Sequence, residues 1–298
     1  MRFKSPLLLD GGLSQQLQAQ GLDLNHPLWT GQVLLEQPEE IKRAHLAFLE
    51  AGARCLITSS YQISSAGLMK MGLNEAEVLH IFRQSVSLAK EARAEFLEKN
   101  IDGGPIYIAV SIGPYGATLS DGSEYRGDDT LSEQELLDFH APRFAMLDEL
   151  EADCYACETI PSLREARVLA ELLAQSKTAG WITFTCKDEK HISDGTPLAA
   201  CASELADRQG VFALGINCTR PQFITPLIEE LKPHLGHCKL VVYPNSGEIF
   251  SAEKKEFYGD ASPLNKLAVE WLDLGVDILG GCCRVGPETI RDFLTLIQ

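Results

Sequence analysis

Three of the nine cysteines in this chain stand where apolar segments end, the place where side chains of a folded domain can meet a ligand. Cys218 closes the segment "VFALGINC", and Cys282 and Cys283 close "VDILGGCC". Thiolates that lie close together repel one another unless a cation lies among them, and zinc is the usual cation for soft thiolate ligands. Three protein ligands leave the fourth position of a zinc ion open, which is typical of a catalytic site.

Two alternatives stay open for these cysteines from the residues alone. Vicinal cysteines do not have the spacing of a zinc finger, and a cysteine at the end of a strand is commonly a packing residue. Cys282 and Cys283 can also act as a redox pair of thiols. In favour of a shared site, we expect Gly280 and Gly281 to let the backbone turn so that both thiols face one point.

Other polar residues close apolar segments in the same manner. Asp10, which Gly11 and Gly12 follow, either holds an ammonium group or caps the next helix. Glu158 lies in the apolar segment "CYACETI", where an unpaired carboxylate is costly, so we expect it to face a ligand. Asn217 either orients a ligand or satisfies strand backbone. These side chains are candidates for binding a small polar substrate.

Two connections between the apolar segments are long, residues 61–75 and 113–132. Long loops in a compact domain are often functional. Tyr61 and Tyr125 lie on these loops and offer aromatic faces for a cation. Glu124 lies beside Tyr125 in the segment "GSEY", which is either a simple turn or part of a loop that closes over a site.

The elements that must position these residues alternate regularly along the chain. Eight apolar, β-branched segments recur, each followed by a helical pattern, and their continuous character is typical of parallel strands covered on both faces. Eight such units in 298 residues predict a single (β/α)8 TIM-type barrel, whose active site lies at the carboxyl ends of the strands. A doubly wound open sheet is the alternative, but no glycine-rich dinucleotide motif follows the first strand. The predicted strands are 6–10, 54–60, 106–113, 153–160, 181–186, 211–218, 239–246 and 276–283.

Helix signals support this plan. Residues 37–53 have apolar residues at helical spacing, and His45 lies on that apolar stripe as a predicted core histidine. Ser162 with Glu165 three residues later is a capping-box pattern. Pro287 marks the first turn of a last helix.

Composition limits the function classes. The chain has 42 acidic and 26 basic residues and a net charge of −16, which argues against nucleic acid and anionic membranes as partners. No apolar segment approaches the length of a membrane span or a signal peptide, so we expect a cytoplasmic protein with reduced cysteines. Most of these thiols are then small core residues. No linker divides the sequence, which predicts one domain over residues 1–298.

Several motifs, taken together, resemble the homocysteine S-methyltransferase family. They are "LLLDGG", "AGARCLITSSYQ", "SIGPYGATLSDGSEYRG", "ETIPSLREA", "GINC", "YPNSGE" and "GGCCR", in the family's order over residues 7 to 295. The resemblance implies a zinc-dependent (β/α)8 barrel that methylates homocysteine to methionine. It places the zinc-binding thiolates on Cys218, Cys282 and Cys283. It places the homocysteine-binding carboxylates on Asp10 and Glu158, with backbone at Gly11 and Gly12 lining the same region.

The compact loops look most like the branch of that family that uses S-methylmethionine, or less well S-adenosylmethionine, as a sulfonium donor. The resemblance therefore implies small-molecule substrates and one Zn²⁺ per chain. Lacking the long C-terminal arm of betaine-dependent members, the chain is expected to be a monomer or weak homodimer. Two other classes stay open: a lyase with a Schiff-base lysine, for which Lys187 is the nearest candidate, and a thiol redox protein.

Overall fold

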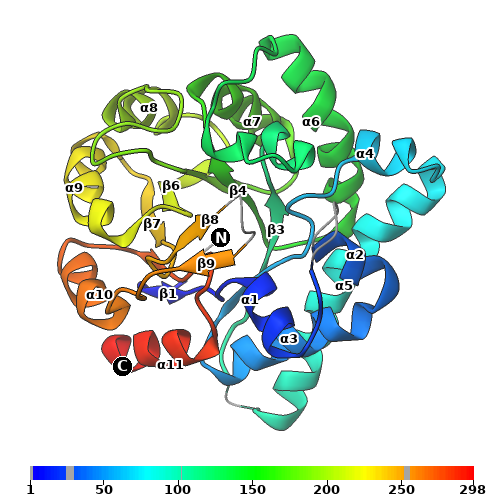
Figure 1. Ribbon diagram of the computed structural model, residues 1–298, viewed down its shortest axis with the longest axis horizontal. Coiled ribbons are helices and arrows are strands. Elements are labelled where there is room, and N and C mark those ends of the chain that lie inside the picture. Colours follow the sequence, from blue (N-terminus) through cyan, green and yellow to red (C-terminus); the bar gives the residue numbers. More distant parts are fainter. Residues whose placement is uncertain (1–2, 25–29, 102, 252–255) are drawn as a thin grey trace.

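Eight parallel strands form a ring that helices cover on the outside, as Figure 1 shows for the computed structural model of the chain. The structure describes residues 3–24, 30–101, 103–251 and 256–298. The arrangement confirms the predicted (β/α)8 barrel and is not the open sheet of the alternative. The strands are β1 Leu7–Leu8, β2 Cys55–Ile57, β3 Tyr107–Ile112, β4 Cys154–Ile160, β5 Gly180–Phe184, β6 Val211–Asn217, β7 Lys239–Tyr243 and β10 Ile278–Leu279.

The ring closes between the two ends of the chain. β1 pairs in parallel with β10, with Leu7 opposite Ile278, and an isolated parallel bridge between Leu9 and Cys55 joins β1 to β2. The remaining strands follow in the order β10-β7-β6-β5-β4-β3-β2. β6 and β10 are therefore separated by β7 alone, which brings the loops after them to the same side of the barrel mouth.

Both faces of the strands are buried, which explains why the apolar segments are continuous rather than alternating. One apolar cluster fills the barrel interior and includes Leu9, Trp181 and Tyr243. A second and larger cluster lies between the strands and the helices, with Phe48, Phe184 and Trp271 among its members. Six cysteines outside the predicted metal set are also buried, as expected for packing residues. They are Cys55, Cys154, Cys157, Cys186, Cys201 and Cys238.

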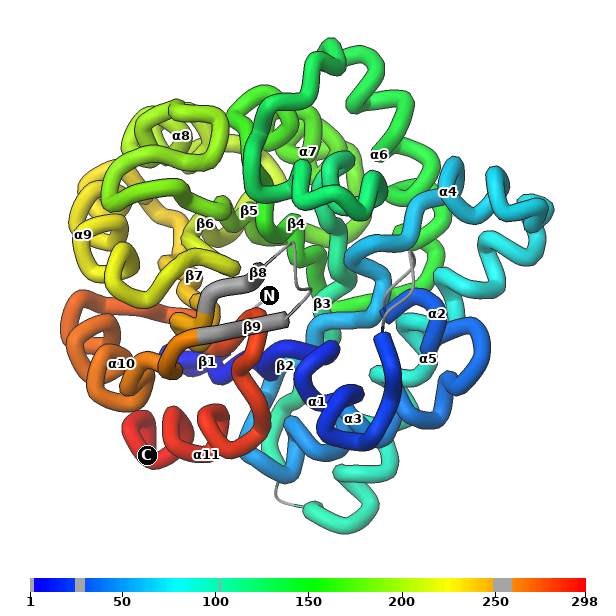
Figure 2. The backbone as a smooth tube through the Cα atoms, in the orientation of Figure 1, coloured from blue at the N-terminus to red at the C-terminus, as the bar shows by residue number. Residues whose placement is uncertain are grey.

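The three helices that the sequence predicts individually, α3, α7 and α11, lie where it places them. The last helix, at the red end of the chain in Figure 2, contacts α3 and β1 and so packs beside the first part of the chain. The helices are α1 Leu13–Ala19, α2 Thr30–Glu36, α3 Pro38–Glu50, α4 Ser65–Lys70, α5 Glu75–Lys99, α6 Glu133–Leu147, α7 Leu163–Gln175, α8 Leu198–Leu205, α9 Pro221–Leu231, α10 Leu264–Asp273 and α11 Pro287–Ile297.

The start of α7 corrects one prediction. Ser162 is the N-cap, and its side chain accepts a hydrogen bond from the Glu165 N–H, as expected. The Glu165 carboxylate does not return the bond that a capping box requires. It is fully buried, where Oε1 accepts from the Tyr115 N–H and contacts His140 Nε2 at 2.8 Å. The Glu165 carboxylate thus contacts Tyr115 and the buried His140 instead of the N–H group of Ser162.

The two long loops contain short helices of their own. Residues 61–75 include α4, and residues 113–132 include the 3₁₀ helices η1 Tyr115–Leu119 and η2 Ser123–Tyr125. A hairpin of β8 Ile249–Ser251 and β9 Glu256–Tyr258 follows β7 and was not predicted. Strands of three residues are too short to give a periodic signal.

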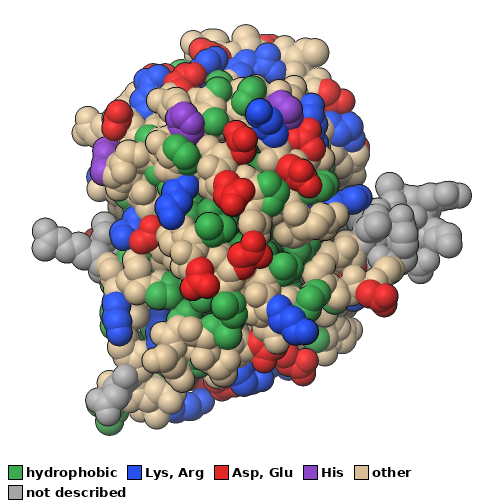
Figure 3. Space-filling model, turned by 90° about the vertical axis from the view of Figure 1, so that its left-hand side faces the viewer, with side chains coloured by type: hydrophobic (Ala, Val, Ile, Leu, Met, Phe, Trp, Pro, Cys, Tyr) green, Lys and Arg blue, Asp and Glu red, His purple; other side chains and the backbone are tan. Residues whose placement is uncertain are grey.

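The surface carries charge of both signs. On the side formed by α8, α9 and α10, acidic and basic side chains are interspersed without a large patch of either sign (Figure 3). Among the described residues, no helix is both long enough and apolar enough to cross a membrane.

His45 is a fully buried core histidine, as predicted, and gives a pH-dependent contribution to stability. Burial lowers its pKa from 6.5 to about 4. Below pH 6.5 the unfolded chain therefore binds a proton that the folded chain does not, and stability falls as the pH approaches 4. We expect this one residue to lower the free energy of unfolding by about 2 kcal/mol between pH 7 and pH 5.

Urea unfolding of His45→Phe at both pH values measures this contribution, since the variant should lose that part of the pH dependence. The exposed His80, replaced by glutamine, serves as the control. Equal pH dependence in the wild type and His45→Phe would contradict the prediction.

Candidate metal centre

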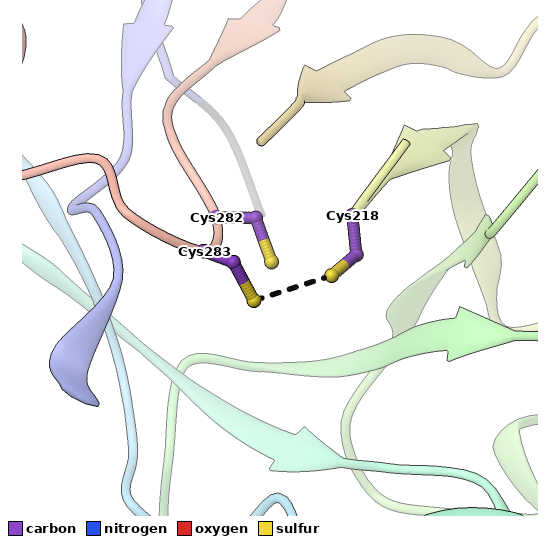
Figure 4. A group of neighbouring side chains, drawn as sticks. All are labelled: Cys218, Cys282 and Cys283. Atoms are coloured by element: carbon purple, nitrogen blue, oxygen red, sulfur yellow. Dashed lines mark hydrogen bonds between the residues drawn. The ribbon is translucent and has the colours of Figure 1, made fainter. Parts of the chain in front are cut away.

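Three cysteine sulfurs converge at the carboxyl ends of the barrel strands. Cys218 follows β6, and Cys282 and Cys283 lie in the loop after β10; their side chains point toward one another (Figure 4). Their sulfur atoms all lie within 4.8 Å of one another, and Cys218 Sγ is 3.5 Å from Cys283 Sγ. Among the described residues, no other group of three His, Cys, Asp or Glu side chains comes together as closely. Cys218 is 64 positions from Cys282 and 65 from Cys283 in sequence, so the fold creates this cluster.

The backbone around the cluster is held in unusual conformations. Cys218 has φ 47° and Arg284 has φ 65°, both in the left-handed region that non-glycine residues rarely adopt. Such residues persist where the surroundings fix them and are often part of functional sites. Gly280 and Gly281 have no positive φ, but a Cβ atom at Gly281 would lie 2.1 Å from Val285 Cγ1 and one at Gly280 would lie 2.6 Å from Leu9 Cβ, so only glycine fits this turn. The left-handed turn of the loop is made at Arg284, directly after the thiols.

Among the three thiols, Cys283 is the one whose thiolate is stabilised by its neighbours. Hydrogen bonds from Cys218, and then from Cys282, hold the pKa of the Cys283 thiol well below its usual range. The pKa of Cys282 is raised by its contacts with Cys218 and Cys283 and by burial. Three convergent sulfurs with one stabilised thiolate are a donor set that suits a thiophilic divalent metal. This chemistry fits zinc.

The first loop packs directly against the cysteine loop. Asp10 is buried, and its Oδ2 accepts a hydrogen bond from the Ile57 N–H at 2.9 Å. It does not cap α1, because the N-cap is Gly12 and no side chain caps that helix. Burial raises the pKa of Asp10 well above its usual value, and the negative charge of Glu158 adds to this. Asp10 therefore lies within electrostatic reach of Glu158.

Gly11 and Gly12 allow this close packing. A Cβ atom at Gly12 would lie 2.5 Å from the carbonyl oxygen of Cys282, and one at Gly11 would lie 2.4 Å from that of Val285. The Gly12 N–H donates to the Val285 carbonyl at 2.8 Å. Both glycines thus bring the end of β1 against the loop that carries the thiols.

Glu158 lies at the end of β4 and is buried, with 7% of its surface exposed. The Ser111 hydroxyl donates a hydrogen bond to its Oε1. Burial raises the pKa of Glu158 to about 7, hydrogen bonds from Ser111 and Tyr243 lower it, and the charge of Cys283 raises it. The charge of Cys283 therefore acts on this buried carboxylate, and its ligand-facing role stays a prediction.

The Asn217 side chain forms hydrogen bonds with Thr159 and so fixes the backbone there. Its Oδ1 accepts from the Thr159 N–H at 2.7 Å, and its Nδ2 donates to the Thr159 hydroxyl at 2.8 Å. Thr159 itself has φ 60°, so the amide fixes a left-handed residue directly after Glu158. The same Nδ2 lies 4.0 Å from Cys282 Sγ. Asn217 therefore links β4 to the cysteine cluster rather than standing free for a ligand.

The two predicted aromatic residues also reach this region. The Tyr125 hydroxyl lies 3.5 Å from Cys218 Sγ, although 45% of the residue's surface is exposed. Burial raises the pKa of Tyr61, and the negative charges of Glu124 and then Cys218 raise it further. The loops after β2 and β3 thus bring both rings to the cysteine cluster.

Sequence reasoning missed three partners of the site. Ser111 and Tyr243 contact Glu158 from β3 and β7, and each looked like an ordinary strand residue. Glu124 was predicted only to lie on a turn or on a loop that closes over a site, and its charge interacts with that of Cys283. Only the position of Ser111 and Tyr243 at strand ends was a signal in the sequence.

Arg284 connects the loop of the thiols to two other segments of the barrel mouth. Its Nη2 lies 3.1 Å from Glu248 Oε1, and its Nη1 donates to Gln15 Oε1 at 2.7 Å. This arginine connects the loop after β7 and helix α1 to the loop of the thiols. Its role is to hold that loop in place.

A barrel with three convergent thiols and two buried carboxylates at the carboxyl ends of its strands defines a class of barrel enzyme whose site fits a thiophilic metal and a cationic ligand. Comparisons with known proteins give the family. The family model described as homocysteine S-methyltransferase matches residues 7–296.

A homocysteine S-methyltransferase of Bacillus subtilis is 48% identical over 292 residues, which cover 96% of this chain and 92% of that protein. A selenocysteine Se-methyltransferase of Brassica oleracea var. italica is 40% identical over 300 residues, with 95% and 86% covered. The metallated crystal form of a homocysteine methyltransferase from Escherichia coli superimposes with a TM-score of 0.89 at 40% identity, covering 98% of this chain and 96% of that one. The chain belongs to the homocysteine S-methyltransferase family and is a methyl-transferring enzyme.

Proposed function

We propose that this enzyme transfers a methyl group from a sulfonium donor to the sulfur of L-homocysteine, giving methionine. The donor is S-methylmethionine, or less well S-adenosylmethionine. Cys218, Cys282 and Cys283 hold one Zn²⁺ per chain. The observation that carries this proposal is the convergence of the three sulfurs beside two buried carboxylates.

The acceptor needs activation because a free thiol, with a pKa of roughly 8.5, is mostly protonated at neutral pH. A zinc ion bound by the three thiolates supplies this activation by lowering the pKa of a thiol and stabilising its thiolate. The homocysteine sulfur attacks the methyl carbon, the carbon–sulfur bond of the donor breaks, and its electron pair stays on the donor sulfur. The leaving group is a neutral thioether, so no general acid is required.

The residues of this chain bind and orient the two substrates. Asp10 and Glu158 offer negative charge to the ammonium group of homocysteine from the ends of β1 and β4. Asn217 holds Thr159 and with it the end of β4, which fixes the direction of the Glu158 side chain. The Tyr125 hydroxyl can donate a hydrogen bond to the Cys218 thiolate. Holding both substrates in line is the main contribution of the protein to the rate.

Replacing Glu158 with glutamine should raise the KM for homocysteine roughly 10- to 100-fold, because the variant loses a charged hydrogen-bond acceptor for the ammonium group. The zinc content should stay that of the wild type. Initial rates at varied homocysteine measure the effect. The exposed Glu171 of α7, replaced by glutamine, is the matched control. An unchanged KM for homocysteine would remove Glu158 from the binding site.

A donor screen with purified enzyme and homocysteine tests the proposed function. We expect methionine to form with S-methylmethionine, more slowly with S-adenosylmethionine, and not with betaine. Faster transfer from betaine, or preference for selenohomocysteine as acceptor, would favour the corresponding alternatives within the family. The name of the Brassica relative makes the selenium acceptor worth including.

Two alternatives from other classes receive less support. Lys187, the candidate Schiff-base lysine, is exposed, whereas a lysine of that kind is activated by burial or by neighbouring positive charge. A thiol redox role for Cys282 and Cys283 does not account for Cys218 or for the buried carboxylates. Absence of methyl transfer from every donor, together with reversible oxidation of the thiols, would favour the redox role.

A further inference from the structure

Glu124 lies on the 3₁₀ helix η2, next to Tyr125, whose hydroxyl is 3.5 Å from Cys218 Sγ, and its carboxylate is within electrostatic reach of Cys283. Its Oε2 atom is buried, and no described residue forms a hydrogen bond with it. Burial raises the pKa of Glu124 to about 7, its own backbone N–H lowers it, and the charges of Asp121 and Cys283 raise it. A buried carboxylate oxygen without a partner is costly unless a ligand provides one.

The turn that carries Glu124 is well fixed. Asp121 Oδ1 accepts from the backbone N–H and the hydroxyl of Ser123, and Arg126 Nη2 donates to that hydroxyl at 2.7 Å. A Cβ atom at Gly116 would lie 2.7 Å from the Glu124 nitrogen, so η1 packs closely against η2 at this point. The backbone that carries the Glu124 side chain is therefore fixed by the fold.

Arg126 does not neutralise the negative charge of Glu124. Arg126 is the cation that lowers the pKa of Glu124, and its effect is the smallest of those acting there. Its guanidinium is already engaged by Asp128 at 3.1 Å and by Asp121 at 3.4 Å. The Glu124 charge instead acts on Tyr61, on Tyr125 and near Cys283. The carboxylate of Glu124 therefore suits a cationic ligand, whose charge would offset its own.

Neither the metal nor homocysteine accounts for this carboxylate. Among the described residues, the group whose ligand atoms lie within 4.8 Å of one another consists of the three cysteines and includes no carboxylate. Asp10 and Glu158, at the ends of β1 and β4, are the groups proposed for the ammonium of homocysteine. The sulfonium of a methyl donor is the cation that must come close to the acceptor sulfur, and hence to Cys283.

We propose that Glu124 binds the sulfonium charge of the methyl donor, with the rings of Tyr61 and Tyr125 beside it as aromatic faces. The inference rests on the proposed function, since it requires a sulfonium substrate. It also has a particular kinetic consequence. The sulfonium loses its charge during transfer, so Glu124 stabilises the bound donor more than the transition state, and releases the neutral thioether product.

The test compares Glu124→Gln with the wild type in the same transfer assay, with S-methylmethionine and homocysteine varied in turn. We expect the KM for S-methylmethionine to rise roughly 10- to 100-fold. The kcat should stay the same or rise slightly, because ground-state stabilisation is lost. The KM for homocysteine and the zinc content should not change. Glu133→Gln, an exposed carboxylate on α6, is the matched control.

A second variant covers the case in which Glu124→Gln does not fold. Glu124→Asp keeps the charge but shortens the side chain, so its KM for the donor should rise by less than about 10-fold while the KM for homocysteine stays unchanged. Tetramethylammonium, a cation without a transferable sulfonium methyl group, should inhibit the wild type competitively with the donor and not with homocysteine.

The outcomes separate the two proposals. An active wild type with an unchanged donor KM in Glu124→Gln would overturn the role of Glu124 and leave the proposed function intact. Equal increases in the KM of both substrates would also overturn it, because they indicate a general disturbance of the site. A wild type that transfers methyl groups from no sulfonium donor would overturn both.

Discussion

Replacing Cys283 with serine is expected to remove the bound metal and to lower the rate of methyl transfer by more than about 100-fold. Replacing a residue that hydrogen-bonds to a metal ligand commonly lowers the metal affinity or the activity 10- to 100-fold. Replacing the ligand itself should have a larger effect. Cys283 also holds the thiolate that its two neighbours stabilise. Serine keeps the size of the side chain but not the soft sulfur donor that zinc prefers.

Metal analysis and initial rates on the reduced protein measure both effects. Cys201→Ser is the matched control, because this cysteine is buried on α8 and does not belong to the cluster. The control should keep its metal and its activity. Full activity in Cys283→Ser, with metal retained, would contradict the assignment of this residue as a ligand.

Replacing Arg143 with methionine is expected to lower the free energy of unfolding by about 3–5 kcal/mol, the usual effect of breaking a buried ionic network by removing one partner. Arg143 is fully buried in α6. Its guanidinium donates to the carbonyl of Ile63 at 3.2 Å and to that of Gly113 at 2.8 Å. It also contacts His140 Nδ1 at 2.7 Å, and His140 in turn contacts the buried carboxylate of Glu165.

This network explains the size of the expected effect. Burial lowers the pKa of Arg143 to about 10, and the nearby Glu165 carboxylate partly offsets this. Without the guanidinium, the two carbonyls would lose their donor, and Glu165 would remain as a buried charge with less compensation. Because Ile63 and Gly113 begin the two long loops, the variant should also weaken donor binding through Tyr61 and Tyr125.

Chemical denaturation at neutral pH measures the loss of stability in Arg143→Met. Arg208→Met is the control, since Arg208 is exposed and its 3.8 Å ion pair with Glu204 should contribute about 0–1 kcal/mol. A loss below about 1 kcal/mol in Arg143→Met, equal to that of the control, would show that the network does not stabilise the fold.

The barrel could be predicted because its signals are local. Each buried strand is a continuous apolar segment, and the helices carry caps and apolar stripes, so Ser162, His45 and Pro287 stand where the sequence placed them. The rule that sites lie at the carboxyl ends of barrel strands also predicts that Cys218 lies near Cys282 and Cys283, as the structure has it.

The remaining features depend on contacts between distant segments. Glu165 looked like part of a local capping box, and its partners His140 and Tyr115 are 25 and 50 residues away in sequence. Asn217 offered two roles that the sequence could not separate, and its bonds to Thr159 cross from β6 to β4. The sequence placed Glu124 on a possible closing loop but could not show the burial of its Oε2 atom, because that burial results from how η1 and η2 pack.

The central claim is that the three cysteines hold a zinc ion whose open position takes the homocysteine sulfur. Zinc analysis of the reduced wild type, followed by X-ray absorption at the zinc edge with and without homocysteine, tests this claim most directly. We predict about one zinc ion per chain, with three sulfur ligands that become four when homocysteine is added. A folded protein that remains free of zinc after incubation with the metal, or a sulfur count that homocysteine leaves unchanged, would contradict the account.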